Sequence, residues 1–240
     1  MALCLQFAVA SDIGRRRQEN QDRWLLREDV QVAAVADGMG GMACGAEAAQ
    51  RALDTVAARV DQAMPGSLAD WRRLLEEANR AVFALGLELS PNQGIGTTLT
   101  LAHWQGSELT LAHVGDSAAL RLRDGNLVQL TPEHTVAAEV RERRAAGSVA
   151  RMPHGAEHML SSCLGLPYLP QEDVRALALL PGDRLLLCSD GLTKPVSSEA
   201  IGATLARSAT PAEAARQLID LANAAGGPDN ITVLVGFVTG

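Results

Sequence analysis

Short apolar segments recur along this chain, and glycine, proline, aspartate or asparagine residues separate most of them. Short apolar runs bounded by turn residues are typical of strands. Asp124-Gly125 is a strong hairpin signal, and a tight hairpin pairs its two strands antiparallel. The expected strands cover residues 3–10, 24–26, 30–36, 97–104, 109–114, 118–122, 127–130, 159–163, 174–177, 184–189 and 232–238.

Segments with helical periodicity lie between the groups of strands. They cover residues 46–60, a stretch from Ser67 to about residue 90, residues 135–146, and two segments near the end of the chain. The last segment starts at Thr210-Pro211-Ala212-Glu213, a capping box with proline at the first helical position, and stops at Gly226-Gly227. Paired helices indicate layers outside one sheet or outside two packed sheets, and periodicity does not decide between the two.

Composition and charge exclude several classes of function. The chain has 240 residues, 47% hydrophobic and 20% charged, which is ordinary for a globular protein. The formal net charge of −7 argues against nucleic acid as the main partner, because phosphate backbones favour a basic face. No apolar run approaches the roughly 18 residues of a membrane span, and the start lacks a signal-peptide pattern. We therefore expect a cytoplasmic protein.

The four cysteines, Cys4, Cys44, Cys163 and Cys188, are scattered and form no C-x-x-C pair. This distribution indicates reduced thiols that are mostly buried. A disulfide framework or a zinc site is not expected.

Aspartates flank several of the expected strands. Asp37, Asp116 and Asp190 follow apolar runs, Asp229 precedes the last one, and each has glycine or another small residue nearby. A single Asp-Gly is most often a turn. Four such aspartates gathered at one end of a sheet would repel one another unless cations neutralised them. Hard divalent cations prefer oxygen ligands, so the pattern favours an all-oxygen site for more than one Mg²⁺ or Mn²⁺ ion.

Six motifs occur in order along nearly the whole chain. They are Ser11-Asp12-Ile13-Gly14-Arg15-Arg16-Arg17-Gln18-Glu19-Asn20-Gln21-Asp22, Ala36-Asp37-Gly38-Met39-Gly40-Gly41, Gly96-Thr97-Thr98-Leu99, His113-Val114-Gly115-Asp116-Ser117, Ser189-Asp190-Gly191-Leu192 and Asp229-Asn230-Ile231-Thr232-Val233. In these motifs the chain resembles the bacterial branch of the metal-dependent protein phosphatases of the 2C type. The resemblance implies an α+β fold of two packed antiparallel sheets flanked by helices on both sides. It also implies one domain over residues 1–240, with a variable flap at about residues 135–170.

The resemblance assigns metal ligands residue by residue. Asp37 matches the carboxylate that bridges two Mn²⁺ or Mg²⁺ ions, and Gly38 matches a carbonyl ligand. Asp190 and Asp229 match the other ligands of the first ion. Asp116, together with Asp190, matches the ligand pair of a third, weaker ion.

The remaining roles concern water and phosphate. Asp22 matches the aspartate that orients metal-bound water, and Arg17 matches the arginine that grips the substrate phosphate. Asn230 is expected to support Asp229 or the water network. Gln21 stands where the family usually has glutamate, so it keeps a hydrogen bond to metal-bound water without the charge, and the second ion is expected to bind more weakly.

Several other residues have plainer interpretations. A basic run such as Arg15-Arg16-Arg17 is usually a solvated face, and only the motif register favours Arg17. His113 is expected to be packed or hydrogen-bonded within a strand, and His134, near the flap, is a candidate for substrate contact. Ala118 replaces a common arginine with little expected effect, and Met39 replaces the histidine of the eukaryotic branch.

The resemblance implies a phosphatase that hydrolyses serine or threonine phosphate esters in proteins. A water or hydroxide that bridges two ions attacks phosphorus directly, so no cysteine nucleophile is needed. The protein would oppose a protein kinase, act on phosphorylated proteins and be a monomer. One alternative is a catalytically weak regulatory module of the same fold, and another is the same chemistry on a small phosphate ester.

Overall fold

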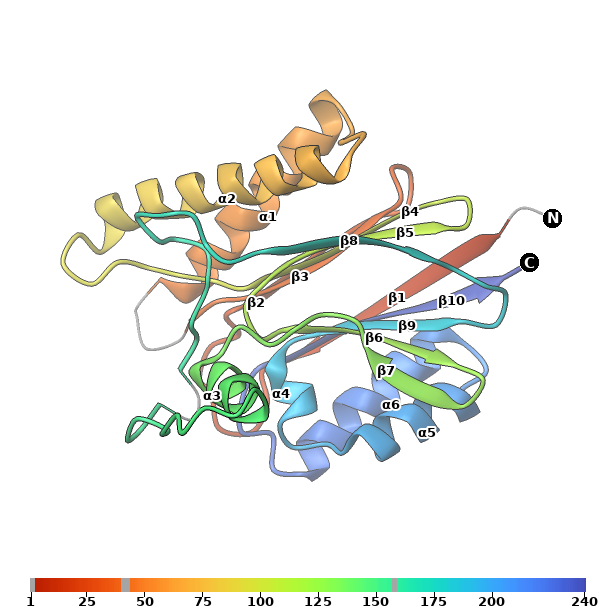
Figure 1. Cartoon of the computed structure of the whole chain (residues 1–240). Helices are drawn as coiled ribbons and strands as arrows, with labels where there is room; N and C mark the ends of the chain where they lie inside the picture. Colours follow the sequence, from red (N-terminus) through yellow and green to blue (C-terminus); the bar gives the residue numbers. More distant parts are fainter. Residues whose placement is uncertain (1–2, 40–43, 157–158) are drawn as a thin grey trace.

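The computed structural model describes residues 3–39, 44–156 and 159–240. Two five-stranded antiparallel sheets pack face to face, and helices cover both outer faces (Figure 1). The expected arrangement of helix, sheet, sheet and helix layers is thereby confirmed. Gly40 and Gly41 of the glycine-rich motif lie outside the described residues.

The first sheet has the strand order β1-β10-β9-β6-β7, and the second has the order β2-β3-β4-β5-β8. The strands are β1 (Cys4–Asp12), β2 (Asp22–Arg27), β3 (Val32–Asp37), β4 (Leu99–Gln105), β5 (Glu108–Val114), β6 (Ala118–Arg123), β7 (Asn126–Gln129), β8 (Asp173–Ala178), β9 (Arg184–Cys188) and β10 (Ile231–Thr239). The two ends of the chain meet in the first sheet, because β1 pairs with β10 over its whole length, from Cys4 opposite Thr239 to Asp12 opposite Ile231.

The helices are α1 (Gly45–Gln62), α2 (Leu68–Leu89), α3 (Val136–Ala145), α4 (Asp190–Thr193), α5 (Ser198–Arg207) and α6 (Pro211–Ala224). The pair α1 and α2 covers the second sheet, while α4, α5 and α6 cover the first (Figure 1). The expected caps are confirmed. Ser67 accepts a hydrogen bond from the Asp70 amide, and Thr210 accepts one from the Glu213 amide.

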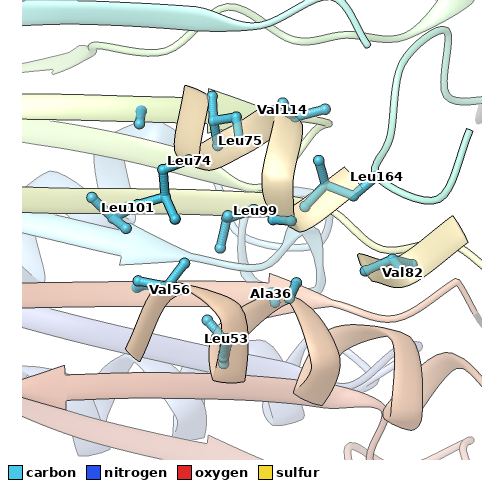
Figure 2. Packing of buried hydrophobic residues seen from close by; sticks show 14 of the residues in the cluster. Ala36, Leu53, Val56, Leu74, Leu75, Val82, Leu99, Leu101, Val114 and Leu164 are labelled. Atoms are coloured by element: carbon cyan, nitrogen blue, oxygen red, sulfur yellow. The ribbon is translucent and has the colours of Figure 1, made fainter. Parts of the chain in front are cut away.

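Three apolar layers hold these parts together. One lies between α1, α2 and the second sheet, where Leu53, Leu74 and Leu101 meet (Figure 2). Another lies between the two sheets, and the third lies between α4, α5, α6 and the first sheet. Burial of apolar surface is the main stabilising contribution to folding, so each helix pair is fixed on its sheet by its own layer.

The local differences from expectation have clear causes. The expected strand 159–163 is wrong, because Leu160 and Leu164 make only isolated bridges, to Thr135 and Thr97. The expected strand 30–36 starts later, at Val32, because Gln31 has a φ of 58°. The hairpin at Asp124-Gly125 is confirmed, since both residues have the positive φ that its tight turn requires.

Candidate metal and phosphate site

Strand register brings the predicted aspartates to one end of the sandwich. Asp22 begins β2 and Asp37 ends β3, and the two lie opposite each other in that antiparallel pair. In the other sheet, Cys188 ends β9 and pairs with both Ala118 of β6 and Val233 of β10. The residues just beyond these pairs therefore share the same end of the sandwich. They include Asp116, Asp190 and Asp229.

A cavity of about 480 Å³ opens at this end. It is lined by Arg17, Asp37, Gly38, Met39, Thr98, Asp116, Met159, Leu160, Cys163, Asp190, Lys194 and Asp229. Six of the residues singled out in the sequence thus share one cavity. Asp22 lies behind its wall, 3% exposed, and its Oδ2 accepts a 2.7 Å hydrogen bond from Ser189 Oγ.

Two adjacent threonines fix the end of β3. The Thr98 hydroxyl accepts a 3.0 Å hydrogen bond from the Asp37 amide, and Thr97 Oγ1 donates to the Asp37 carbonyl at 2.9 Å. Thr98 Oγ1 also bonds Ser117 Oγ at 2.7 Å, next to Asp116. Sequence reasoning placed these threonines in a motif without giving them a role. They tie the Asp37 and Asp116 segments together.

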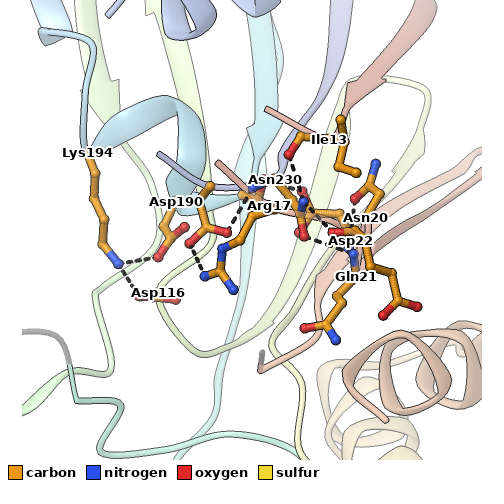
Figure 3. Close-up of polar contacts among 12 residues, drawn as sticks. Ile13, Arg17, Asn20, Gln21, Asp22, Asp116, Asp190, Lys194 and Asn230 are labelled. Carbon is orange, nitrogen blue, oxygen red and sulfur yellow. Dashed lines mark hydrogen bonds and ion pairs between the residues drawn. The ribbon is translucent and has the colours of Figure 1, made fainter. Parts of the chain in front are cut away.

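Asn230 holds the arginine-bearing loop against the last strand. Its Nδ2 donates to the carbonyls of Ile13 and Glu19 at 3.0 and 2.9 Å, and its Oδ1 accepts from the Gln21 amide at 2.9 Å (Figure 3). One side chain thus bridges the segment before Asp22 to the segment that carries Asp229, while the predicted support of Asp229 or of the water network stays a prediction.

Asp22 and Asp37 have no cationic side chain among their hydrogen-bond and ion-pair partners in the described residues. Burial, reinforced by the charges of Asp190 and Asp229 and only partly offset by the Ser189 hydroxyl, raises the pKa of Asp22 to about 6. Burial and the neighbouring carboxylates, Asp22 first among them, raise the pKa of Asp37 well above its usual range. Removal from water and like-charge repulsion both disfavour the ionised form.

The other three aspartates face cations. Arg17 Nη2 donates to Asp229 Oδ2 at 2.8 Å. Lys194 Nζ donates to Asp190 Oδ2 and lies 3.6 Å from Asp116 Oδ2 (Figure 3). Burial and the charge of Asp190 raise the pKa of Asp116 to about 7, although Lys194 acts in the opposite direction. The carboxylates of Asp190 and Asp116 outweigh partial burial and raise the pKa of Lys194.

These residues fit hard divalent cations. Asp22 Oδ1 and Asp190 Oδ1 are buried and have no hydrogen-bond partner in the part of the chain that the structure describes. An unpaired buried carboxylate oxygen is costly unless a cation or water meets it. Gly38 lies so close to Gly45 that a Cβ would overlap the Gly45 carbonyl oxygen, which keeps the backbone at this point bare. All of the candidate ligands are oxygens, as Mg²⁺ and Mn²⁺ prefer.

The carboxylates are not preorganised as a single cage. Within residues 3–39, 44–156 and 159–240, no three acidic, histidine or cysteine side chains are already grouped closely enough to hold one ion. Asp229 is turned toward Arg17 and Asp190 toward Lys194. Rotation of the Asp229 side chain away from Arg17 would accompany metal binding, whereas Asp190 can keep Oδ2 on Lys194 because its Oδ1 has no partner within the described residues.

Gln21, His113 and His134 lie outside the cavity lining. Gln21 does not line the cavity, and its Oε1 lies beside the Gly45 backbone. His113 is fully buried and bonds Thr100 Oγ1 and the carbonyls of Gly115 and Pro132, as expected. His134 is 3% exposed and accepts from the Gly115 amide, so the suggested substrate contact is wrong and its role is to hold the turn before Asp116.

The cysteines do not supply a nucleophile. Cys163 borders the cavity, but burial raises the pKa of its thiol to about 11. Burial also raises the pKa of Cys188. Within the described residues all four cysteines are free thiols, but only Cys163 and Cys188 are buried. Cys44 is half-buried and Cys4 is exposed, so the expectation of mostly buried thiols holds for two of the four. None of the described helices is long and apolar enough to cross a membrane.

Comparison with known proteins gives a consistent answer over nearly the whole chain. A family model described as protein phosphatase 2C matches residues 13–223. Serine/threonine phosphatase Stp of Listeria monocytogenes is 31% identical over 94% of this chain and 92% of its own length. Serine/threonine protein phosphatase PstP of Mycobacterium tuberculosis is 37% identical over 99% of this chain. The chain spans only 46% of the PstP sequence, which is about half of that relative.

A solved structure shows the same arrangement. The crystal structure of the catalytic domain of PstP in complex with two manganese ions superposes with a TM-score of 0.83 and 37% sequence identity, covering 99% of this chain and all of that domain. The serine/threonine phosphatase of S. agalactiae superposes with a TM-score of 0.84 at 30% identity, covering 98% of this chain and 99% of that one.

Proposed function

The chain belongs to the protein phosphatase 2C family, and from that premise we propose that it is a metal-dependent serine/threonine phosphoprotein phosphatase. The observation that carries the proposal is the gathering of five aspartates at one end of the sandwich, with an arginine at the cavity rim. A binding module has no need for buried carboxylates that repel one another, because they destabilise the fold unless cations bind.

We propose that residues of the cavity wall are the metal ligands, as the family resemblance implies. Asp37, the Gly38 carbonyl, Asp190 and Asp229 would hold two Mn²⁺ or Mg²⁺ ions, with Asp22 acting through a water and Asp116 contributing to a third position. Bound ions of this kind lower the pKa of a water so that it can attack phosphorus at neutral pH. The presence of two manganese ions in the PstP catalytic domain supports this assignment.

Arg17 is suited to bind the substrate phosphate. Its side chain is 38% exposed at the cavity rim, and the side chain of its partner Asp229 is 31% exposed, so exchange of this ion pair for another anion costs little. An arginine fork binds phosphate oxygens in a bidentate way. With Asp229 held as a metal ligand, the guanidinium of Arg17 would be free of its ion pair and could bind the phosphate.

The rim of the cavity favours a protein substrate. Met159 on its edge is 57% exposed, which leaves apolar surface for a polypeptide. We propose phosphoserine or phosphothreonine in proteins as the substrate and a serine/threonine kinase as the opposing activity. We further propose one phosphatase domain over residues 1–240 with a flap at about residues 135–170, a monomeric state and a cytoplasmic location.

The test is phosphate release from p-nitrophenyl phosphate and from a phosphothreonine peptide, in Mn²⁺, in Mg²⁺ and in EDTA. Asp190→Ala removes a cavity carboxylate, whereas Asp54→Ala, on the exposed side of α1, is its matched control. We expect metal-dependent turnover of both compounds that EDTA and Asp190→Ala abolish and Asp54→Ala preserves. Binding of Mn²⁺ without turnover would favour the regulatory module, and turnover of the small ester alone would favour a metabolite phosphatase.

A further inference from the structure

The chain contains a single lysine. Of its 21 lysine and arginine residues, 20 are arginines, and the remaining one is Lys194. This lysine reaches the candidate metal site. Its Nζ donates to Asp190 Oδ2 and lies 3.6 Å from Asp116 Oδ2 (Figure 3). Sequence reasoning gave Lys194 no role.

The position of Lys194 is set by the same turn of helix that positions Asp190. The two residues are four apart at the ends of α4, and the Lys194 amide donates to the Asp190 carbonyl at 2.9 Å. Side chains four residues apart in a helix lie on one face. Leu192, between them, is fully buried and anchors the turn in the layer beneath the first sheet.

This contact differs from an ordinary surface ion pair. Exposed pairs contribute little because water screens them. Here the side chains of Asp116 and Asp190 are each only 11% exposed, and one ammonium faces both carboxylates. The three side chains also line both the 480 Å³ cavity and a neighbouring cavity of about 260 Å³ between α3, α4 and α5. A hydrated ion could approach the carboxylate pair from either side, so access does not decide its occupancy.

The charge balance of the site limits how many ions it can hold. Five carboxylates face two cationic side chains, Arg17 and Lys194, which leaves at most three uncompensated negative charges. Two divalent ions already exceed that number. A third ion beside Asp116 and Asp190 would stand next to the Lys194 ammonium, and like charges repel strongly where water is partly excluded.

We propose that Lys194 is the built-in counter-ion of the Asp116–Asp190 pair, so that this chain holds two divalent ions and binds a third only by displacing the lysine side chain. The inference rests on the proposed two-ion phosphatase site. In this arrangement the Lys194 ammonium occupies the third position of the site in place of a metal ion.

The first test is calorimetric titration of the metal-free protein with Mn²⁺. Lys194→Met keeps the length of the side chain and removes its charge, while Lys194→Arg keeps the charge. Arg141→Met is the matched control, because it removes a positive charge from the wall of the neighbouring cavity without touching either aspartate. We expect two ions per chain in the wild type, in Lys194→Arg and in Arg141→Met. Lys194→Met should bind a third ion about 10- to 100-fold more tightly than the wild type.

The second test uses the wild-type chain alone. Because there is one lysine, ¹³Cε-lysine labelling gives one side-chain signal, from Lys194. During titration with Mg²⁺ we expect that signal to keep its paired position through two equivalents and to move toward a free lysine only at higher concentration.

The outcomes separate the two proposals. Two tight ions with no difference between Lys194→Met and the wild type would overturn the role of Lys194 and leave the phosphatase intact. A third ion bound tightly in the wild type, or a lysine signal already at the free position in the metal-free protein, would also overturn it. Failure of the wild type to bind any Mn²⁺ would remove the proposed function and this inference together.

Discussion

The two sides of the site neutralise their charge differently. Asp22 and Asp37, on paired strands of the second sheet, have no cationic partner within residues 3–39, 44–156 and 159–240, and we call them the uncompensated pair. Asp116, Asp190 and Asp229, beyond the strands of the first sheet, contact Lys194 or Arg17, and we call them the compensated group. At this end of the sandwich, the aspartates of the second sheet thus lack cationic partners within the described residues. The aspartates of the first sheet already contact Lys194 or Arg17.

This difference indicates where metal ions matter most. The uncompensated pair is held in a rigid β-ladder and by the Thr97 and Thr98 hydroxyls, so it cannot relieve its repulsion by moving apart. The compensated group sits on turns and on the short helix α4, and its carboxylates already have partners to exchange. Bound ions would thus supply positive charge to the uncompensated pair. In the compensated group they would compete with Arg17 and Lys194 for the carboxylates.

The largest effect is expected from Asp37→Asn in the uncompensated pair. It removes the carboxylate proposed to bridge both ions, so kcat/KM for the phosphothreonine peptide should fall at least about 10³-fold. The metal-free variant should melt no lower than the wild type, because a buried charge is lost. Asp54→Asn is the control for the loss of a charge alone. Normal turnover by Asp37→Asn would refute the bridging role.

A smaller effect is expected from Arg17→Ala, which strips one cation from the compensated group. Loss of a charged hydrogen bond to phosphate should raise KM about 10- to 100-fold and lower kcat less. The neighbouring exposed Arg16 provides the control, since Arg16→Ala should leave both constants unchanged. An equal rise in KM in Arg16→Ala would contradict a specific role for Arg17. It would favour the interpretation of Arg15-Arg16-Arg17 as a solvated basic face.

The pH dependence of metal stabilisation probes both groups together. Burial and repulsion raise the pKa of Asp22 to about 6 and that of Asp116 to about 7, above their values in an unfolded chain. The folded protein therefore binds more protons in this interval. Stability from these groups is present at low pH and is lost as the pH rises through about 6 to 7.

Metal ions require the deprotonated carboxylates, so protons compete with them. The rise in Tm caused by about 1 mM Mn²⁺ should be larger near pH 8 than near pH 5.5. Subtracting the Tm without Mn²⁺ from the Tm with Mn²⁺ at each pH cancels the contribution of groups that do not bind metal. Buried His113, whose pKa burial lowers to about 3, is one such group. A larger rise at the acidic pH would contradict the carboxylate assignment.

The smallest effect is expected from Gln21→Glu, which adds negative charge beside the uncompensated pair. The Gln21 side chain lies near Gly45 outside the cavity, so water partly screens the attraction between the added charge and a metal ion. The affinity for the second ion should therefore rise only about 2- to 5-fold. Calorimetric titration with Mn²⁺ measures this, with Gln18→Glu on the exposed loop as the control. An unchanged affinity would remove Gln21 from the metal site.

The sequence predicted most of the fold and the acidic residues, for a physical reason. Strand ends and hairpins are local features, and an aspartate next to glycine at the end of an apolar run is visible without knowing its neighbours. In an antiparallel pair, the residue that follows one strand lies at the same end as the residue that precedes its partner. Asp190 after β9 therefore shares one end of the first sheet with Asp116 before β6 and Asp229 before β10. In the second sheet, Asp37 at the end of β3 lies opposite Asp22 at the start of β2.

Features that depend on contacts between distant segments could not be read in this way. Residues 159–163 have a strand-like composition, yet Leu160 finds only a single bridging partner. The role of Lys194 depends on the short helix α4 directing it back toward Asp190 and across to Asp116, 78 residues earlier in the chain. Thr97 and Thr98 read as strand residues until their hydroxyls are seen on the Asp37 backbone. A search for lone basic residues near acidic motifs would have found Lys194.

The most direct measurement of the central claim is a titration of Mn²⁺ into metal-free protein in which bound ions per chain and phosphothreonine-peptide hydrolysis are followed on the same samples. We expect no turnover in EDTA, little turnover with one ion bound, and full turnover as the second metal position is occupied. Full turnover in EDTA or with a single bound ion would contradict a site that needs two bound ions for hydrolysis.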